Sequence, residues 1–201
     1  MPSSALKASS ATRIAERAAQ LLCNEHGKDI KLARQQAMHD LGLSKHDPQP
    51  SDSEIELAVT DYRRLFNPEY DDELLKLRQK ALALLNFFQA FQPYLVGSVL
   101  KGSACKHSDI NLLVYSDDPK SIEIFLLNQQ IDYDCRERKT QYRQTDAPNI
   151  AFWFDQSQVN LQVLPSSARH QHSKKTDRAN LAQLTQLLAN DSVGSLAATL
   201  D

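Results

Sequence analysis

One stretch of the sequence holds residue types whose spacing suits phosphate chemistry. Gly97 and Ser98 follow a short apolar run at 94–96, and a Ser-Asp pair at 108–109 opens a second apolar run at 110–115. A glycine at a strand end lets the backbone turn and approach a ligand closely. The serine after it offers a hydroxyl and an N–H and can cap a helix. Together Gly97 and Ser98 should form a sharp turn of the backbone, which we call the Gly97-Ser98 corner. A turn of this kind suits a phosphate group.

The spacing resembles the signature of the DNA polymerase β-like nucleotidyltransferase superfamily, especially its minimal bacterial members, over about residues 75–165. In that family a Gly-Ser pair is followed, on the next strand, by Asp-x-Asp or Asp-x-Glu. Here Asp109 matches the first carboxylate, and Asn111 stands in place of the second. The resemblance implies that a nucleoside triphosphate is bound by the corner and nearby residues, which are Gly97, Ser98, Lys101, Gly102 and Ser108.

The family's third carboxylate lies on a later strand of the form apolar-Asp-apolar. Val159-Asn160-Leu161 has that form, with asparagine in the middle. The resemblance therefore implies Asp109, Asn111 and Asn160 as the catalytic positions and Asp109 as the remaining metal ligand. The family uses two magnesium ions, which carry the triphosphate and activate the acceptor hydroxyl. Because magnesium prefers anionic oxygen and an asparagine cannot accept a proton, we expect weak or absent magnesium binding and impaired catalysis.

Two functions are compatible with this pattern. The first is a nucleotidyltransferase that binds a nucleoside triphosphate and transfers its NMP to a hydroxyl of a protein, an RNA or a small molecule. Asp117, Asp118 or Glu123 would then have to supply the missing charge. The second is a catalytically inactive relative that acts as a nucleotide-sensing or protein/RNA interaction module.

A third function, nucleic-acid binding, depends on two basic clusters. One is the segment 169–178, and the other consists of Arg136, Arg138, Lys139 and Arg143. We interpret 169–178 as a solvated polar linker ahead of the last helix, from which basic side chains can also reach a triphosphate.

The hydrophobic periodicity predicts an α+β fold, in which a small mixed β-sheet with packed helices follows an N-terminal helical region. We assign residues 1–66 to the helical extension, 67–168 to the nucleotidyltransferase-like domain, and 169–201 to the basic linker and C-terminal helix. Helices are predicted at 11–26, at 30–41 with Asp29 as the cap and Gly42 as the end, and at 53–66. Further helices are predicted at 68–91 with Asn67 as the cap and Pro68 as the first helical residue, at 121–130 and at 179–188. Strands are predicted at 94–96, 110–115, 131–137, 149–155 and 158–164, with Gln156-Ser157 as the turn of the last hairpin.

The strand pattern also predicts how the site is assembled. Residues two apart on a strand share a face, so Asp109 and Asn111 should face the Gly97-Ser98 corner across adjacent strands. Asn160 should point into the same cleft. On its strand, Val159, Leu161 and Val163 should share one face, and Asn160, Gln162 and Leu164 the other.

Composition restricts the class of protein. With 23 Lys and Arg against 25 Asp and Glu, the chain is close to neutral, which predicts no general affinity for polyanions. No apolar run approaches a membrane span and the N-terminus lacks a signal-peptide layout, so we expect a cytoplasmic protein. The three cysteines are widely spaced and odd in number, which predicts neither disulfides nor a zinc site. We expect Cys23 on a helix, Cys105 near the corner and Cys135 on a strand.

Overall fold

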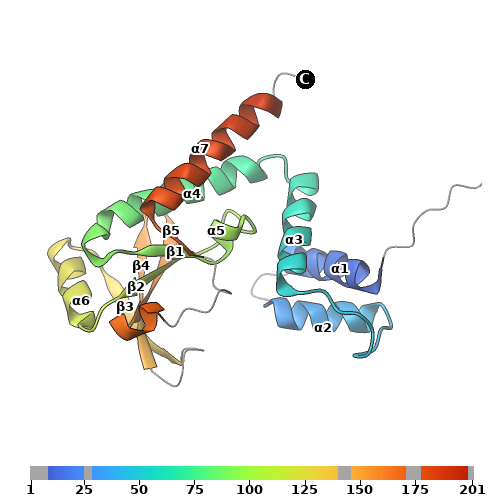
Figure 1. Ribbon diagram of the computed structural model, residues 1–201, viewed down its shortest axis with the longest axis horizontal. Coiled ribbons are helices and arrows are strands. Elements are labelled where there is room, and N and C mark those ends of the chain that lie inside the picture. Colours follow the sequence, from blue (N-terminus) through green and yellow to red (C-terminus); the bar gives the residue numbers. More distant parts are fainter. Residues whose placement is uncertain (1–8, 25–28, 140–145, 171–177, 199–201) are drawn as a thin grey trace, which may run out of the picture. The chain divides into compact units, whose positions relative to one another are not determined.

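The computed structural model describes residues 9–24, 29–139, 146–170 and 178–198 (Figure 1). The chain divides into two compact units, residues 1–70 and 71–201. Over the described residues, the first unit is helical, and the second is a six-stranded sheet with its helices. An α+β fold in which a mixed sheet follows an N-terminal helical region in the sequence is thus confirmed.

The first unit is built from α1 (Ser10–Asn24), α2 (Ile30–Asp40) and α3 (Asp52–Phe66). Asp29 caps α2 as predicted, because its side chain accepts a hydrogen bond from the Leu32 N–H. Small and branched side chains let the three helices approach closely around a common core. This core includes Ile14, Ala18, Ala33, Ala37, Ile55 and Val59.

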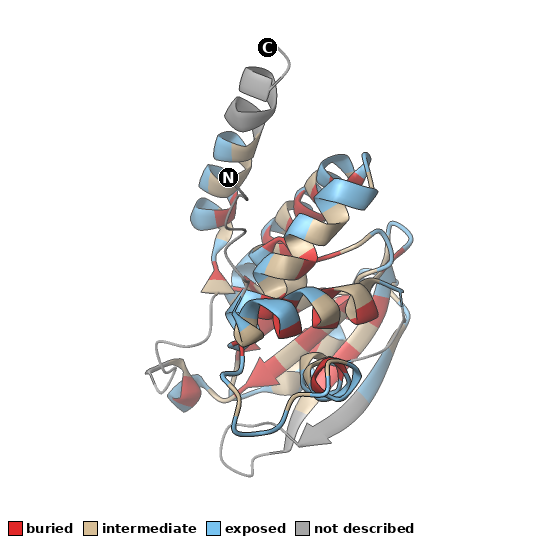
Figure 2. Ribbon diagram, turned by 90° about the vertical axis from the view of Figure 1, so that its right-hand side faces the viewer, coloured by how far each residue is buried: buried red, intermediate tan, exposed pale blue. Residues whose placement is uncertain are grey.

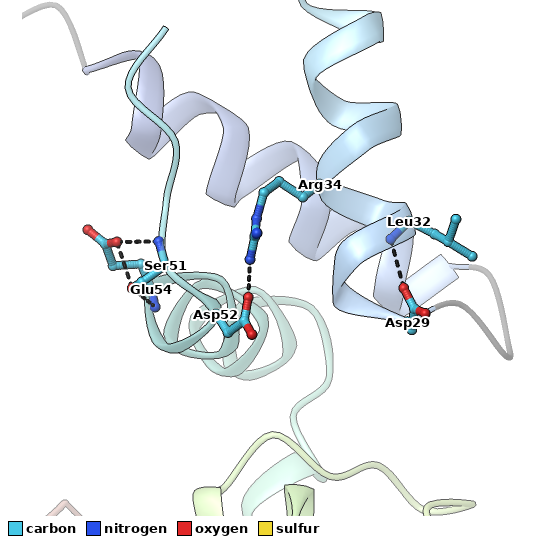
Figure 3. A network of polar contacts seen from close by, with 6 residues as sticks. All are labelled: Asp29, Leu32, Arg34, Ser51, Asp52 and Glu54. Atoms are coloured by element: carbon cyan, nitrogen blue, oxygen red, sulfur yellow. Dashed lines mark hydrogen bonds and ion pairs between the residues drawn. The ribbon is translucent and has the colours of Figure 1, made fainter. Parts of the chain in front are cut away.

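Two polar contacts fix the start of α3 (Figure 3). Ser51 and Glu54 form a capping box, in which each side chain accepts a hydrogen bond from the other residue's backbone N–H. Arg34 of α2 pairs with Asp52, the first residue of α3. These contacts place α3 against the core of the first unit.

The junction between α3 and the next helix differs from the prediction by two residues. Asn67-Pro68 does end α3, but α4 spans Tyr70–Phe87, so Pro68 is not its first residue. The Asn67 side chain accepts a hydrogen bond from the Glu69 N–H, which makes a local turn in place of a helix cap. Beyond α4 the short 3-10 helix η1 (Gln89–Phe91) leads into the sheet.

The sheet of the second unit has the strand order β3-β4-β5-β2-β1-β6. Its strands are β1 (Tyr94–Val96), β2 (Ile110–Tyr115), β3 (Tyr133–Lys139), β4 (Asp146–Phe154), β5 (Ser157–Leu164) and β6 (Arg178–Ala179). The pair β2–β5 is parallel and the other described pairs are antiparallel, so the sheet is mixed. The charged strand β3 lies at an edge of the sheet, where charged residues discourage pairing with a further strand.

Helices α4 and α6 (Pro119–Asn128) cover one face of the sheet. The ring of Phe88, just after α4, lies 5.6 Å from that of Phe125 in α6 and 5.8 Å from that of Phe152 in β4. The residues of β5 that share this face with Phe152 are buried, whereas their neighbours at 158, 160 and 162 are half-buried. Figure 2 shows alternation of this kind as red and tan bands on the sheet. The predicted alternation of Val159, Leu161 and Val163 with Asn160, Gln162 and Leu164 is confirmed.

The β4–β5 hairpin turns one residue earlier than predicted. Asp155 and Gln156 are the turn residues, and both have positive φ, 43° and 61°. Two consecutive residues of positive φ match the twist of a tight hairpin, usually with glycine or asparagine. Ser157 therefore belongs to β5, and the Lys80 ammonium donates a hydrogen bond to its hydroxyl.

The end of the chain also differs from the prediction. Residues 166–170 form the 3-10 helix η2 (Ser166–His170), and Arg178 and Ala179 form β6 rather than linker and helix. The last helix, α7 (Leu181–Ala198), starts two residues later than predicted and is longer.

The cysteines lie where the sequence placed them. Cys23 is in α1, Cys105 follows the short helix α5 (Ser98–Lys101), Cys135 is in β3, and none of the three is in a disulfide. Within the described residues, no helix combines the length and apolarity that crossing a membrane requires.

Candidate functional site

Gly97 joins β1 to α5 in a backbone conformation that suits glycine alone. Its φ is 79° and its ψ is −157°, a region that is essentially inaccessible to other residues. A Cβ at this position would lie 3.2 Å from Asn111 Nδ2, which is closer than an ordinary contact. The corner therefore requires a glycine for two reasons. Its backbone conformation excludes other residues, and a Cβ would press against the Asn111 side chain.

Asp109, Asn111 and Asn160 come together beside this corner. Val96 pairs with Asn111 across β1 and β2, and Asn111 pairs with Asn160 across β2 and β5. Asn160 Nδ2 donates hydrogen bonds to Asp109 Oδ2 at 2.9 Å and, more weakly, to Asn111 Oδ1 at 3.4 Å. The predicted juxtaposition of these three residues with Gly97 is confirmed, and we call these four residues the amide site.

The orientation of the Asn160 amide follows from chemistry. An ionised carboxylate only accepts hydrogen bonds, so Asn160 must present its nitrogen to Asp109. That nitrogen then lies between two side-chain oxygens, one of Asp109 and one of Asn111, where it donates to both. A cation that bridged Asp109 and Asn111 would need these same two oxygens, and the Asn160 N–H group faces both of them.

The residues of the amide site do not fit a magnesium pair. Asp109 is its one carboxylate, and the Asn160 amide already satisfies one of its oxygens. Magnesium loses its water reluctantly, and amide oxygens repay that loss poorly. Among the described residues, no group of three or more His, Cys, Asp or Glu side chains is placed to hold a metal.

The carboxylates that could have replaced the missing charge lie elsewhere. Asp117 and Asp118 follow the far end of β2, on the order of 20 Å along the strand from Asp109. Asp117 accepts a hydrogen bond from the Ser166 N–H, which lowers the pKa of its carboxyl group. Glu123 lies in α6 and accepts a hydrogen bond from the Tyr133 hydroxyl, which raises the pKa of that tyrosine.

Three residues predicted to bind phosphate have other surroundings. Gly102 lies at the opposite end of α5 from Gly97, with φ at 86°, where it serves as the C-cap. Lys101, the last residue of α5, is exposed. The Ser108 hydroxyl accepts a hydrogen bond from the Cys105 N–H, which closes the turn before Asp109.

A buried arginine in α4, which the sequence reasoning missed, holds α5 in place. Arg78 is 7% exposed, and its guanidinium donates hydrogen bonds to the carbonyl oxygens of Val99 and Leu100, each at 3.1 Å. It also forms an ion pair with Asp191 of α7 at 2.6 Å. Carbonyl groups at the C-terminal end of a helix lack intrahelical donors and carry partial negative charge. Arg78 supplies both the missing hydrogen bonds and a positive charge at this end of α5. It thereby helps to orient the corner at the other end.

Two arginines of the 169–178 segment pack onto the sheet, so the interpretation of this segment as solvated is wrong for them. The Arg178 guanidinium lies 4.7 Å from the ring centre of Tyr94 and donates a hydrogen bond to the Tyr115 hydroxyl. Arg169 stacks over Tyr115 at 5.5 Å and donates to the Gln92 side chain. The contacts between each guanidinium and the tyrosine ring beneath it are cation–π interactions.

The other basic residues that define the two clusters are not among those whose side chains the structure describes. Residues 171–177 and Arg143 lie outside the described residues, and so do the side chains of Arg136, Arg138 and Lys139.

Replacing Gly97 with alanine tests the close packing of the corner. We expect Gly97→Ala to destabilise the protein by about 3 kcal/mol, from the backbone strain and the contact with Asn111 together. Gly42→Ala is the matched control, because Gly42 also has positive φ but no neighbour within 4 Å of an added Cβ. It should cost only about 1 kcal/mol, the strain of the backbone alone. Urea unfolding of both variants gives the comparison, and equal losses would contradict the close packing.

None of the protein-family models compared with the chain matches it. None of the curated proteins matches either. Among solved structures, the chain is similar to a cytoplasmic RNA terminal U-transferase, with 20% identity over 55% of this chain and 38% of that chain, at a TM-score of 0.37. It is similar to the Cid1 poly(U) polymerase with MgGTP bound, with 17% identity over 51% and 38% of the two chains, also at 0.37. Cid1 with the UTP analog UMPNPP matches at 17% identity over 55% and 38%, again at 0.37.

These similarities cover only 38% of the other chains. At these TM-scores they establish no substrate or activity for this chain.

Proposed function

We propose that this chain binds a nucleoside triphosphate at the amide site and the Gly97-Ser98 corner with little dependence on magnesium. Bound nucleotide serves as a signal for an interaction module rather than as a substrate for rapid transfer. The observation that carries the proposal is the hydrogen bond from the Asn160 amide to Asp109 at 2.9 Å.

That hydrogen bond changes the charge that a ligand meets. A bare carboxylate beside the corner would repel a triphosphate, whereas a carboxylate held by an amide donor offers less unsatisfied negative charge. The first N–H groups of α5 have no intrahelical partners, and Ser98 adds a hydroxyl. Phosphate oxygens are strong acceptors for such donors.

One arginine of the sheet lies on the same face as the amide site. Arg178 pairs with Val96, which pairs with Asn111, which pairs with Asn160, so one row crosses four strands. Directly paired residues point to the same side of a sheet. The Arg178 guanidinium therefore lies on the face that carries the amide site, where it packs against Tyr94 and donates to Tyr115 toward the opposite end of β2 from Asp109.

The proposal is tested by equilibrium titration of the intact chain with fluorescent ATP and GTP analogues in the presence of chelator. Asn160→Leu should weaken binding about tenfold or more, because Asp109 loses its donor and repels the phosphates. Gln162→Leu is the matched control, since it makes a similar amide-to-leucine change two residues along the same strand face. It should leave the affinity unchanged.

Competition with inorganic triphosphate distinguishes phosphate recognition from base recognition. The proposal requires that triphosphate displaces the nucleotide. It is wrong if the unmodified chain binds no nucleotide, or if both leucine variants bind as tightly as the unmodified chain.

Transfer activity is measured separately. The chain is incubated with α-labelled nucleoside triphosphates and magnesium, and covalent label on protein and on added RNA is counted. We expect none above background, because the amide site offers no metal pair and has an asparagine at position 160, where the resemblance implies the carboxylate that helps to activate the acceptor.

A further inference from the structure

A groove of about 570 Å³ runs along α1 and α3 of the first unit. Its apolar wall comes from α3, where Leu57, Leu65 and Phe66 are 62%, 76% and 65% exposed. The core of the first unit uses Ile55 and Val59 of the same helix instead. Fully burying a large apolar side chain contributes about 1.5–3 kcal/mol, so this exposed row is well suited to a partner.

The dimensions of the groove fit a short helix. Its lining extends over residues 11–20 of α1 and 54–66 of α3. At 1.5 Å per residue, these walls are about 14 and 18 Å long, which corresponds to roughly three turns of an α-helix. A helix in a groove of this kind inserts apolar side chains from positions i, i+3 or i+4, and i+7.

The polar lining has one sign of charge. Glu16 of α1 and Glu54 and Asp61 of α3 line the groove, and no Lys, Arg or His side chain is among its lining residues. Hydrogen bonds from Ser51 lower the pKa of Glu54, so this carboxylate remains charged at neutral pH. Lysines or arginines beside the apolar stripe of the occupant would complement these three charges.

A second copy of the chain is a poor occupant. In a two-fold dimer the same patch faces itself, so the acidic side chains of one groove would meet those of the other. Like charges brought together in this way oppose association.

We propose that the α1–α3 groove is a docking site for a basic amphipathic helix of a partner protein, about three turns long. The apolar stripe of that helix packs on Leu57, Leu65 and Phe66. Its flanking basic residues pair with Glu16, Glu54 and Asp61. This surface shares no residue with the amide site, because all residues that line it belong to the first unit.

Fluorescence anisotropy of the full chain with three synthetic 18-residue helical peptides tests this. The peptides share one leucine stripe and carry lysine, glutamine or glutamate at the flanking positions. The lysine peptide should bind at least about tenfold more tightly than the glutamate peptide. Its affinity should fall with added salt, which screens exposed charges.

Variants of the chain locate the binding surface. Leu57→Ser with Leu65→Ser should weaken the lysine peptide about tenfold or more, and Asp61→Lys should reduce its advantage over the glutamate peptide. Leu32→Ser is the matched control, because Leu32 is 54% exposed on α2 and does not line the groove. It should have no effect.

Four results would overturn the proposal. They are absence of binding, equal affinity for the three peptides, an equal loss in the Leu32→Ser control, or self-association of the chain through these leucines.

Discussion

Replacing Asn111 and Asn160 together with aspartate is expected to make the stability of this protein depend on magnesium. The variant would place three carboxylates where one now lies, and it would remove the amide that donates to Asp109. Without metal, the like charges repel one another and raise one another's pKa. We expect a loss of about 3 kcal/mol in chelator.

Magnesium should restore most of that loss. A metal present at about 100 times its dissociation constant stabilises the folded state by about 2.7 kcal/mol. Thermal unfolding of the double variant, with magnesium and with chelator, measures both effects. The unmodified chain should show little difference between the two conditions.

A single charge placed further along β5 is the control. Gln162→Glu adds a carboxylate on the same strand face, two residues beyond Asn160. It should not create a magnesium response. If the double variant ignores magnesium, or if Gln162→Glu responds equally, then Asn111 and Asn160 do not occupy metal-ligand positions.

Replacing Arg78 with methionine is expected to cost about 3–5 kcal/mol, on the order of 10 °C in Tm. The change leaves two carbonyl oxygens of α5 without a donor and Asp191 without its partner. Arg78→Lys should recover part of the loss, because an ammonium keeps the charge but cannot reproduce the guanidinium's geometry.

Arg17→Met is the matched control for Arg78→Met. Arg17 pairs with Asp40 at 2.6 Å, but both side chains are more exposed than that of Arg78. Exposed pairs contribute about 0–1 kcal/mol, so this variant should unfold at nearly the unmodified temperature. Hydrogen exchange should also show faster opening of α5 in Arg78→Met alone. Equal effects of the two replacements would contradict a positioning role for Arg78.

The sequence was sufficient to predict the assembly of the amide site because strand geometry is periodic. Two apolar runs with a Gly-Ser pair between them specified β1, α5 and β2, and alternation specified which residues share a face. These two rules predict that Asp109, Asn111 and Asn160 lie together. Their roles toward a nucleotide remain proposals.

Arg78 was missed although the sequence contains a signal for it. It lies four residues after Leu74 and three before Ala81, on the same helical face as these buried residues. A charged residue on an apolar stripe indicates a buried partner. The identity of that partner could not be predicted, because Asp191 lies 113 residues further along the chain.

β6 and the hairpin turn were missed for different reasons. A strand of two residues has no periodicity to detect, so nothing indicated that Arg178 joins the sheet. Asp155-Gln156 lacks the glycine that usually indicates a two-residue turn of positive φ. In both cases pairing with neighbouring strands determines the local structure.

The most direct test of the amide site is the dissociation constant of a nucleoside triphosphate for the unmodified chain, measured in magnesium and in chelator. With one carboxylate present and its oxygen bonded to the Asn160 amide, we predict that the two values differ by less than about threefold. Binding that requires magnesium, or a dissociation constant lowered tenfold or more by it, would show that other residues complete a metal site. In that case Asn111 and Asn160 would not be the residues that set the chemistry of this protein.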